Sequence, residues 1–146
     1  MWKSLKHKAS LARQLTVREW LALIEAWWGL LYFHLALRRM SYERLNSSIR
    51  VTPGERSGQS GGVEVAERMH RLVGWAARLH ILPMTCLMRA FALRWMLARR
   101  GIPAQIRIGA SKSAAELHAH AWLEVEGQAV GEAEDVGDRF SVLTPK

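Results

Sequence analysis

A single cysteine and a pair of histidines are the residues of this chain whose types and spacing could do chemistry. Cys86 is the only cysteine, and it precedes an apolar stretch that follows Pro83. His118 and His120 stand on either side of one alanine further along the chain. A cysteine attacks a carbonyl carbon as the thiolate, and an adjacent imidazole is a common base for its proton. These residues therefore predict a thiol nucleophile and its base.

The position of Cys86 favours the thiolate. Thr85 is a good helix N-cap residue, so a helix is expected to begin at Cys86. The unpaired amides and the dipole at a helix N-terminus favour an anion, and the same amides can donate to the oxyanion that forms when a carbonyl is attacked. The alternative is that Cys86 is a small buried hydrophobic residue, as free cysteines often are. The residues by themselves leave both interpretations open.

The two histidines lie in a segment, 117–125, whose apolar residues alternate as in a β-strand. Because successive side chains of a strand point to opposite faces, His118, His120, Trp122 and Glu124 share one face. Either histidine could then meet the thiol. Two histidines on one strand face could also bind a metal ion, but they have no clear third ligand, so we predict no metal and no other cofactor.

An acidic residue is expected beside the base, because it fixes the tautomer of the imidazole and stabilises the imidazolium. The Glu-Gly pair at 126–127 predicts a tight turn that joins 117–125 to a strand at 128–132. Counting outward from this turn places residue 121 opposite residue 132, so Glu132 falls within one register step of His120. The alternatives are other acidic residues downstream, or an acidic group that is merely solvated. These alternatives are Glu134, Asp135 and Asp138.

Helices are predicted to precede the strands and to position Cys86. Thr16 and Glu19 match a capping box, which predicts a long helix to about residue 40. Its apolar residues cover more than one stripe, which indicates contact on two sides. We expect its three tryptophans to pack in the core, with a partner surface as the alternative. Residues 41–62 are rich in Ser and Gly and predict a flexible loop.

Further along the chain, apolar spacing predicts a helix at 63–79 and a second at 85–100, which is apolar enough to lie in the middle of a domain. Short strands are predicted at the ranges 104–108, 117–125, 128–132 and 140–143, with a turn or loop at 109–116. Helices followed by antiparallel strands indicate an α+β fold. We expect residues 1–62 to form a helical region and loop packed on a core formed by residues 63–146.

Composition restricts the environment and the partners of the chain. A lone cysteine excludes an intramolecular disulfide and a four-cysteine zinc site, so we expect a reducing, cytoplasmic compartment. A net charge of +8 attracts acidic partners, but no nucleic-acid motif is present, and an acidic partner peptide is at least as good an explanation. The apolar stretch 20–37 contains Glu25 and His34, which argues for a buried or interfacial helix instead of a membrane span.

Several motifs together resemble one family. They are Thr-Cys-Leu-Met-Arg-Ala at 85–90, Arg-Arg-Gly-Ile-Pro-Ala at 99–104, His-Ala-His-Ala-Trp-Leu-Glu-Val-Glu-Gly at 118–127 and Val-Gly-Glu at 130–132. In this order and spacing they resemble the transglutaminase-like cysteine peptidases of lasso peptide biosynthesis, the B proteins. The resemblance covers about residues 83–132, and residues 1–80 resemble the family only in being helical.

The resemblance implies a papain- or transglutaminase-like core and a thiol mechanism that removes the leader from a ribosomally made precursor peptide. It implies Cys86 as the nucleophile, His120 as the base and Glu132 as the orienting acid, where the family usually has Asp. His118, Trp122 and Arg89 are expected to contact the substrate. After leader removal, an ATP-dependent, asparagine-synthetase-like cyclase would close the macrolactam.

Longer members of that family carry an N-terminal leader-recognition module with a three-stranded sheet. Nothing between residues 1 and 82 alternates like those strands, so the chain resembles the split form, in which a separate protein recognises the leader, and we expect weak activity alone. Two other functions stay open. One is transglutaminase-type amide transfer through the same thioester. The other is a non-catalytic adaptor whose Trp-rich helix at 16–40 contacts a partner or a membrane surface.

Overall fold

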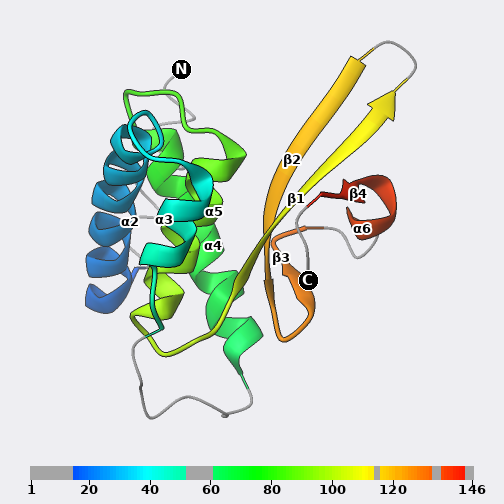
Figure 1. Cartoon of the computed structure of the whole chain (residues 1–146). Helices are drawn as coiled ribbons and strands as arrows, with labels where there is room; N and C mark the ends of the chain where they lie inside the picture. The colour runs from blue at the N-terminus through cyan, green and yellow to red at the C-terminus, as the bar shows by residue number, and fades with distance from the viewer. Residues whose placement is uncertain (1–14, 52–60, 114–115, 133–135, 144–146) are drawn as a thin grey trace, which may run out of the picture.

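The elements of the fold follow one another as helices and then strands. The structure, a computed structural model, describes residues 15–51, 61–113, 116–132 and 136–143. The helices that precede the sheet lie on one side of it, and a short helix near the end of the chain lies on the other (Figure 1). In chain order the elements are α2 (Val17–Ala36), α3 (Tyr42–Ser48), α4 (Gly62–Leu79), α5 (Cys86–Ala98), β1 (Gln105–Ser113), β2 (Glu116–Val125), β3 (Gln128–Val130), α6 (Val136–Arg139) and β4 (Ser141–Val142).

The helix starts have the capping interactions that the sequence predicts. At the start of α2, the Glu19 amide donates to Thr16 Oγ1 at 3.3 Å, and the Thr16 amide donates to Glu19 Oε2 at 2.9 Å. At the start of α5, the Met88 amide donates to Thr85 Oγ1 at 3.4 Å. The predicted capping box and the helix start at Cys86 are therefore confirmed.

The prediction of an unbroken loop over 41–62 is wrong, because α3 occupies part of it. Ser41 caps this helix, and its Oγ accepts from the Arg44 amide at 3.4 Å. Leu45 is fully buried and fixes the helix to the core. Arg94 of α5 donates from Nη1 to the Asn46 carbonyl at 2.8 Å, so α3 is also held by a hydrogen bond that local sequence does not show. The rest of the predicted loop, residues 52–60, lies outside the described residues.

Among the described residues, four strands form one antiparallel sheet in the order β3-β2-β1-β4. The predicted strand at 104–108 is too short, since β1 runs to Ser113 and pairs with β2 through most of the predicted loop. Backbone hydrogen bonding continues there without alternating apolar residues, and the β1–β2 hairpin projects beyond the helices (Figure 1). The predicted fourth strand is present as β4, which pairs with Gly109 and Ala110.

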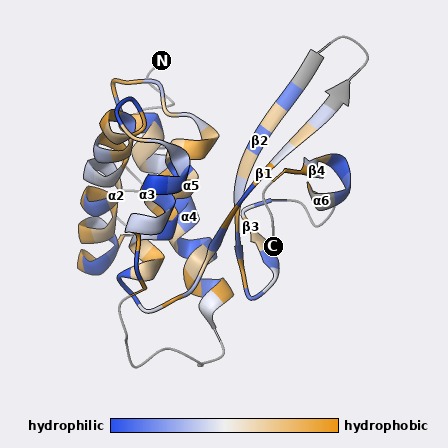
Figure 2. Cartoon of the chain, viewed as in Figure 1, coloured by the Kyte–Doolittle hydropathy of each residue, from blue (hydrophilic) through white to orange (hydrophobic). Residues whose placement is uncertain are grey.

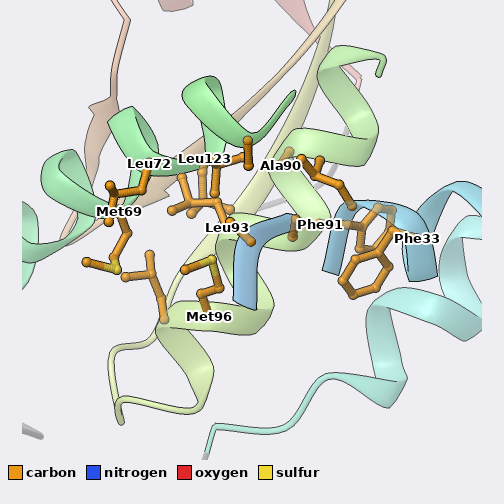
Figure 3. Close-up of a cluster of buried hydrophobic side chains, with 14 of the residues drawn as sticks. Phe33, Met69, Leu72, Ala90, Phe91, Leu93, Met96 and Leu123 are labelled. Carbon is orange, nitrogen blue, oxygen red and sulfur yellow. The ribbon is translucent and has the colours of Figure 1, made fainter. Parts of the chain in front are cut away.

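Helix α5 lies in the middle of the fold, as predicted. It packs against α2, α4 and β2. Phe33 of α2 and Phe91 of α5 stack with ring centroids 5.5 Å apart, and Leu93, Met96 and Leu123 continue the core toward the sheet (Figure 3). Because the helix that begins at Cys86 is held on several sides, the position of the thiol is set by the core.

Replacing Phe91 with Ala should lower the free energy of unfolding by about 3–5 kcal/mol, since it removes a large side chain and leaves a cavity. Phe91 is 0% exposed and its ring also contacts Tyr42. Urea unfolding measures the change. Ile81→Ala, at a residue 91% exposed, serves as the control and should shift stability by under about 0.5 kcal/mol. Equal effects of the two substitutions would contradict the central place of α5.

Helix α2 buries one face only, and a second apolar face is exposed. The exposed residues recur every third or fourth position and include Val17, Trp20, Leu21, Ile24, Trp28, Tyr32 and Leu35. Figure 2 shows apolar segments along the outer edge of this helix. The expectation that all three tryptophans pack in the core is wrong for Trp20 and Trp28, the second of which is 60% exposed. Trp27 is half-buried and stacks on His80 at 4.5 Å.

None of the helices in the described ranges is long and apolar enough to cross a membrane.

Candidate active site

Cys86 is the first residue of α5 and is half-buried. Its place follows from local sequence, because Pro83 breaks the preceding segment and Thr85 caps the new helix. The first-turn amides of a helix carry partial positive charge and favour an anion nearby. The thiol therefore stands where a thiolate and a developing oxyanion can both be stabilised.

His120 of β2 is paired with the acid that strand counting predicts. His120 Nε2 lies 2.8 Å from Glu132 Oε1. The pairing of Leu123 with Val130 fixes this register, which continues to residue 121 opposite residue 132, although β3 itself ends at Val130. An imidazole held in this way has one ring nitrogen engaged and Nδ1 left for a second partner.

Cys86, His120 and Glu132 line one cleft of about 70 Å³. Its walls come from α4, α5, β2 and the end of β3. The full lining is His70, Cys86, Arg89, Ala90, Leu93, His120, Ala121, Trp122, Leu123, Val130 and Glu132. The residues predicted as nucleophile, base and acid are thus brought together from segments that are far apart in sequence.

The other acids considered for His120 are placed differently. Glu134 and Asp135 lie outside the described residues. Asp138 is exposed in α6 and does not line the cleft. Glu132 is the carboxylate that contacts His120 within the described part of the chain.

The residues expected to contact a substrate differ in their access to the cleft. Arg89 lines it and is exposed, and its Nη2 donates to the Met84 carbonyl at 3.4 Å. His118 is exposed and lies outside the cleft walls, toward the tip of the β1–β2 hairpin. Trp122 contributes to the wall but is only 2% exposed, so most of its surface is closed to a peptide.

The buried Trp122 instead supports the ring of His120. Its ring centroid lies 6.0 Å from that of His120, and Phe140 contacts both rings at 5.3 and 6.2 Å. Gly109, which pairs with His120 in the sheet, leaves room for this packing, because a Cβ there would lie 3.0 Å from the Trp122 ring and 2.7 Å from Phe140 Cβ. The ring of His120 is therefore held by the aromatic side chains of Trp122 and Phe140.

Two site residues were not predicted from the sequence, and both are on α4. His70 lines the cleft opposite the strands, and Glu67 Oε1 accepts from the Gly131 amide at 2.7 Å. A Cβ on Gly131 would overlap the His70 ring. The sequence does contain one indication of His70: it follows the buried Met69 on the apolar side of α4, where a polar side chain ordinarily needs a hydrogen-bond partner.

Burial lowers the pKa of His70 below its ordinary value of 6.5, while Glu67 and Glu132 act in the opposite direction. The pKa of His80 is lowered too, again by burial and with His34 contributing. An unfolded chain then binds more protons than the folded chain just below pH 6.5. The stability that these neutral histidines contribute is present above that pH and is lost as the pH falls below it and through the lower pKa of each folded-state histidine.

We therefore expect the melting temperature to fall between pH 7.5 and 5.5, and to fall less in a His70→Gln variant. Differential scanning fluorimetry at the two pH values measures this difference. A double variant that also carries His80→Gln should reduce the dependence further. A fall of the same size in all three proteins would contradict the assignment.

Within the described residues, no group of three or more His, Cys, Asp or Glu side chains is arranged to hold a metal ion. The chemistry that the described side chains support is acyl transfer. A thiol at a helix N-terminus with an acid-paired imidazole can form and resolve a thioester.

Comparison with known proteins agrees with this geometry at the level of the family. No curated protein and no solved structure matches the chain. Residues 29–144 match the transglutaminase-like superfamily, so the match includes part of α2, the helix that begins at Cys86 and the whole sheet. The chain therefore belongs to the transglutaminase-like superfamily.

Proposed function

We propose that this chain is a cysteine peptidase that removes the leader from a ribosomally made lasso peptide precursor. The observation that carries the proposal is the shared cleft, in which Cys86 begins a buried helix and His120 is held by Glu132 at 2.8 Å. The motifs that resemble the lasso peptide B proteins include these residues. Membership of the transglutaminase-like superfamily is compatible with such a thiol mechanism.

In the proposed reaction, His120 Nδ1 takes the proton of the Cys86 thiol, and the thiolate attacks the carbonyl carbon of the scissile peptide bond. First-turn amides of α5 donate to the oxyanion. The imidazolium, stabilised by Glu132, then protonates the leaving amine as the C–N bond breaks. His120 then deprotonates a water molecule, which attacks the thioester carbonyl. The C–S bond breaks, the carboxylic acid product leaves, and the proton held by His120 is again shared with the Cys86 thiolate.

Two features of the surface support action with partner proteins. The net charge of +8 suits acidic partners, and the exposed apolar residues of α2 are gathered on one face of the helix, whereas exposed apolar residues are ordinarily scattered singly. We assign this face to a separate leader-recognition protein. Cyclisation by an ATP-dependent, asparagine-synthetase-like enzyme would follow leader removal.

The test is cleavage of the precursor by the chain, with and without the leader-recognition protein, followed by mass spectrometry. We expect slow cleavage alone, faster cleavage with the partner, and a smaller stimulation for Trp28→Ser, which leaves the cleft intact. Full turnover by the isolated chain would contradict the dependence on a partner. An added primary amine distinguishes hydrolysis from amide transfer, because only the second incorporates the amine into the product.

A further inference from the structure

Helix α4 contacts the backbone immediately before the proposed orienting acid. Gly131 links Val130, the last residue of β3, to Glu132. We propose that Glu67 and His70 of α4 are positioning residues, which hold Gly131 and thereby keep Glu132 against His120. This inference rests on the proposed role of Glu132 and goes further, because it assigns a function to residues outside the proposed triad.

The first contact is a hydrogen bond to the backbone of Gly131. Its amide donates to Glu67 Oε1 at 2.7 Å, a length typical of a strong hydrogen bond to a carboxylate. The strand pairing of β3 with β2 ends one residue earlier, at Val130. The Glu67 carboxylate therefore binds the first backbone amide after the strand pairing ends. This hydrogen bond restrains the peptide unit that precedes Glu132.

The second contact is the ring of His70. This ring lies so close to Gly131 that a Cβ at this position would overlap it. Gly131 also has φ of +70°, a conformation that favours glycine. Both the overlap with His70 and the positive φ require glycine at position 131, in the turn that leads to Glu132. The His70 ring packs against this turn on the side of the cleft.

The charges around His70 suit this role. Glu67 and Glu132 are its carboxylate neighbours, and Arg89 and Arg71 are its basic neighbours. Burial lowers the pKa of His70 and so favours the neutral ring. A neutral imidazole can pack against the turn without competing, as a cation would, with His120 for Glu132.

Ordinary packing between a helix and a sheet is the alternative. It would make substitutions at Glu67 and Gly131 alter stability alone. Positioning predicts a different result, because a base that is displaced or held in the wrong tautomer lowers kcat while substrate binding is kept. The two explanations are therefore separated by kinetics and by the ionisation of His120, instead of by stability.

The experiment compares Glu67→Ala with Glu67→Gln in the full chain, with Glu64→Ala as the control. Glu64 is an exposed carboxylate on the same helix and pairs only with Arg68 at 3.6 Å among the described contacts. We expect kcat for precursor cleavage to fall about tenfold or more in Glu67→Ala with KM nearly unchanged. Glu67→Gln, which keeps an acceptor for the Gly131 amide, should restore most of it.

A second pair tests the glycine. Gly131→Ala is compared with Gly127→Ala, since Gly127 also has a positive φ, of +78°, but a Cβ there meets nothing within 4 Å. Nitrogen NMR of the histidine rings reports the tautomer and titration of His120 in each variant. We expect Gly131→Ala and Glu67→Ala to change the His120 signals, and Gly127→Ala and Glu64→Ala to leave them as in the wild type.

Unchanged His120 signals and unchanged kcat in Glu67→Ala and Gly131→Ala would overturn the inference. The NMR measurement needs no substrate, so it separates this outcome from failure of the proposed function. If the wild-type chain does not cleave the precursor but the His120 signals respond as expected, the contact positions His120 and the peptidase assignment is wrong.

Discussion

Replacing Cys86 with alanine should abolish precursor cleavage, with a loss of rate on the order of 10⁴-fold or more. No other described residue of the cleft can form the thioester, so the remaining activity would come from substrate binding and the helix amides alone. Because Cys86 is half-buried at the start of α5 and Thr85 keeps its capping bond, the fold should be preserved. Single-turnover cleavage followed by mass spectrometry measures the loss.

The melting temperature of the Cys86→Ala variant is the necessary companion measurement, since it separates loss of chemistry from loss of structure. Cys86→Ser is a useful second variant, because it keeps the size of the side chain and replaces a good nucleophile by a poor one. Cleavage at the wild-type rate in a folded Cys86→Ala protein would end the peptidase assignment. It would favour the adaptor hypothesis, in which the thiol only packs.

Replacing His120 with glutamine should lower the rate of cleavage by about 10³-fold or more, because it removes the proposed base that takes the thiol proton and protonates the leaving amine. Glutamine can still donate a hydrogen bond from its side-chain amide to Glu132 and is similar in length to histidine, so the strand should keep its place. The rate of Cys86 alkylation by iodoacetamide at pH 7 should fall in the same variant. This second measurement tests the thiol–imidazole pair without a peptide substrate.

His118→Gln is the matched control for His120, because it lies on the same strand and the same face but outside the cleft walls. It should leave alkylation of Cys86 unchanged. Equal losses in the two histidine variants would mean that the resemblance assigns the base to the wrong histidine or that neither histidine acts on the thiol.

The parts of the site that depend on local rules could be predicted from sequence. A threonine before an apolar run predicts a capped helix, and Thr85 has that role. A Glu-Gly pair between alternating segments predicts a tight turn, and counting from it leads to the contact between His120 and Glu132. Both inferences use short-range geometry in which the position of one residue determines that of the next.

Features that depend on tertiary contacts were not predicted. Helix α3 is held by the burial of Leu45 and by Arg94, which is distant in sequence, and its own composition resembles a loop. The outer half of the β1–β2 hairpin is paired through backbone groups, which carry no hydrophobic pattern. Trp28 was predicted to be buried and is exposed. An apolar side chain is buried only where another element of the fold covers it.

The contribution of α4 to the site shows the same limit. His70 lies on the apolar side of α4 and so needs a partner, but a carboxylate such as Glu67 on an amphipathic helix is ordinarily solvated. Their roles depend on Gly131, which is remote in sequence and reaches them only when β3 docks against α4. No rule applied within either segment indicates this contact.

The separation of Cys86 and His120 between α5 and β2 has a consequence for how their shared cleft forms as the chain folds. Cys86 and His120 come to line one cleft only when β2 packs against α5. Contacts between distant segments form slowly because the loop between them must first be closed. A newly made chain therefore has no cleft lined by both residues until helix and sheet have joined.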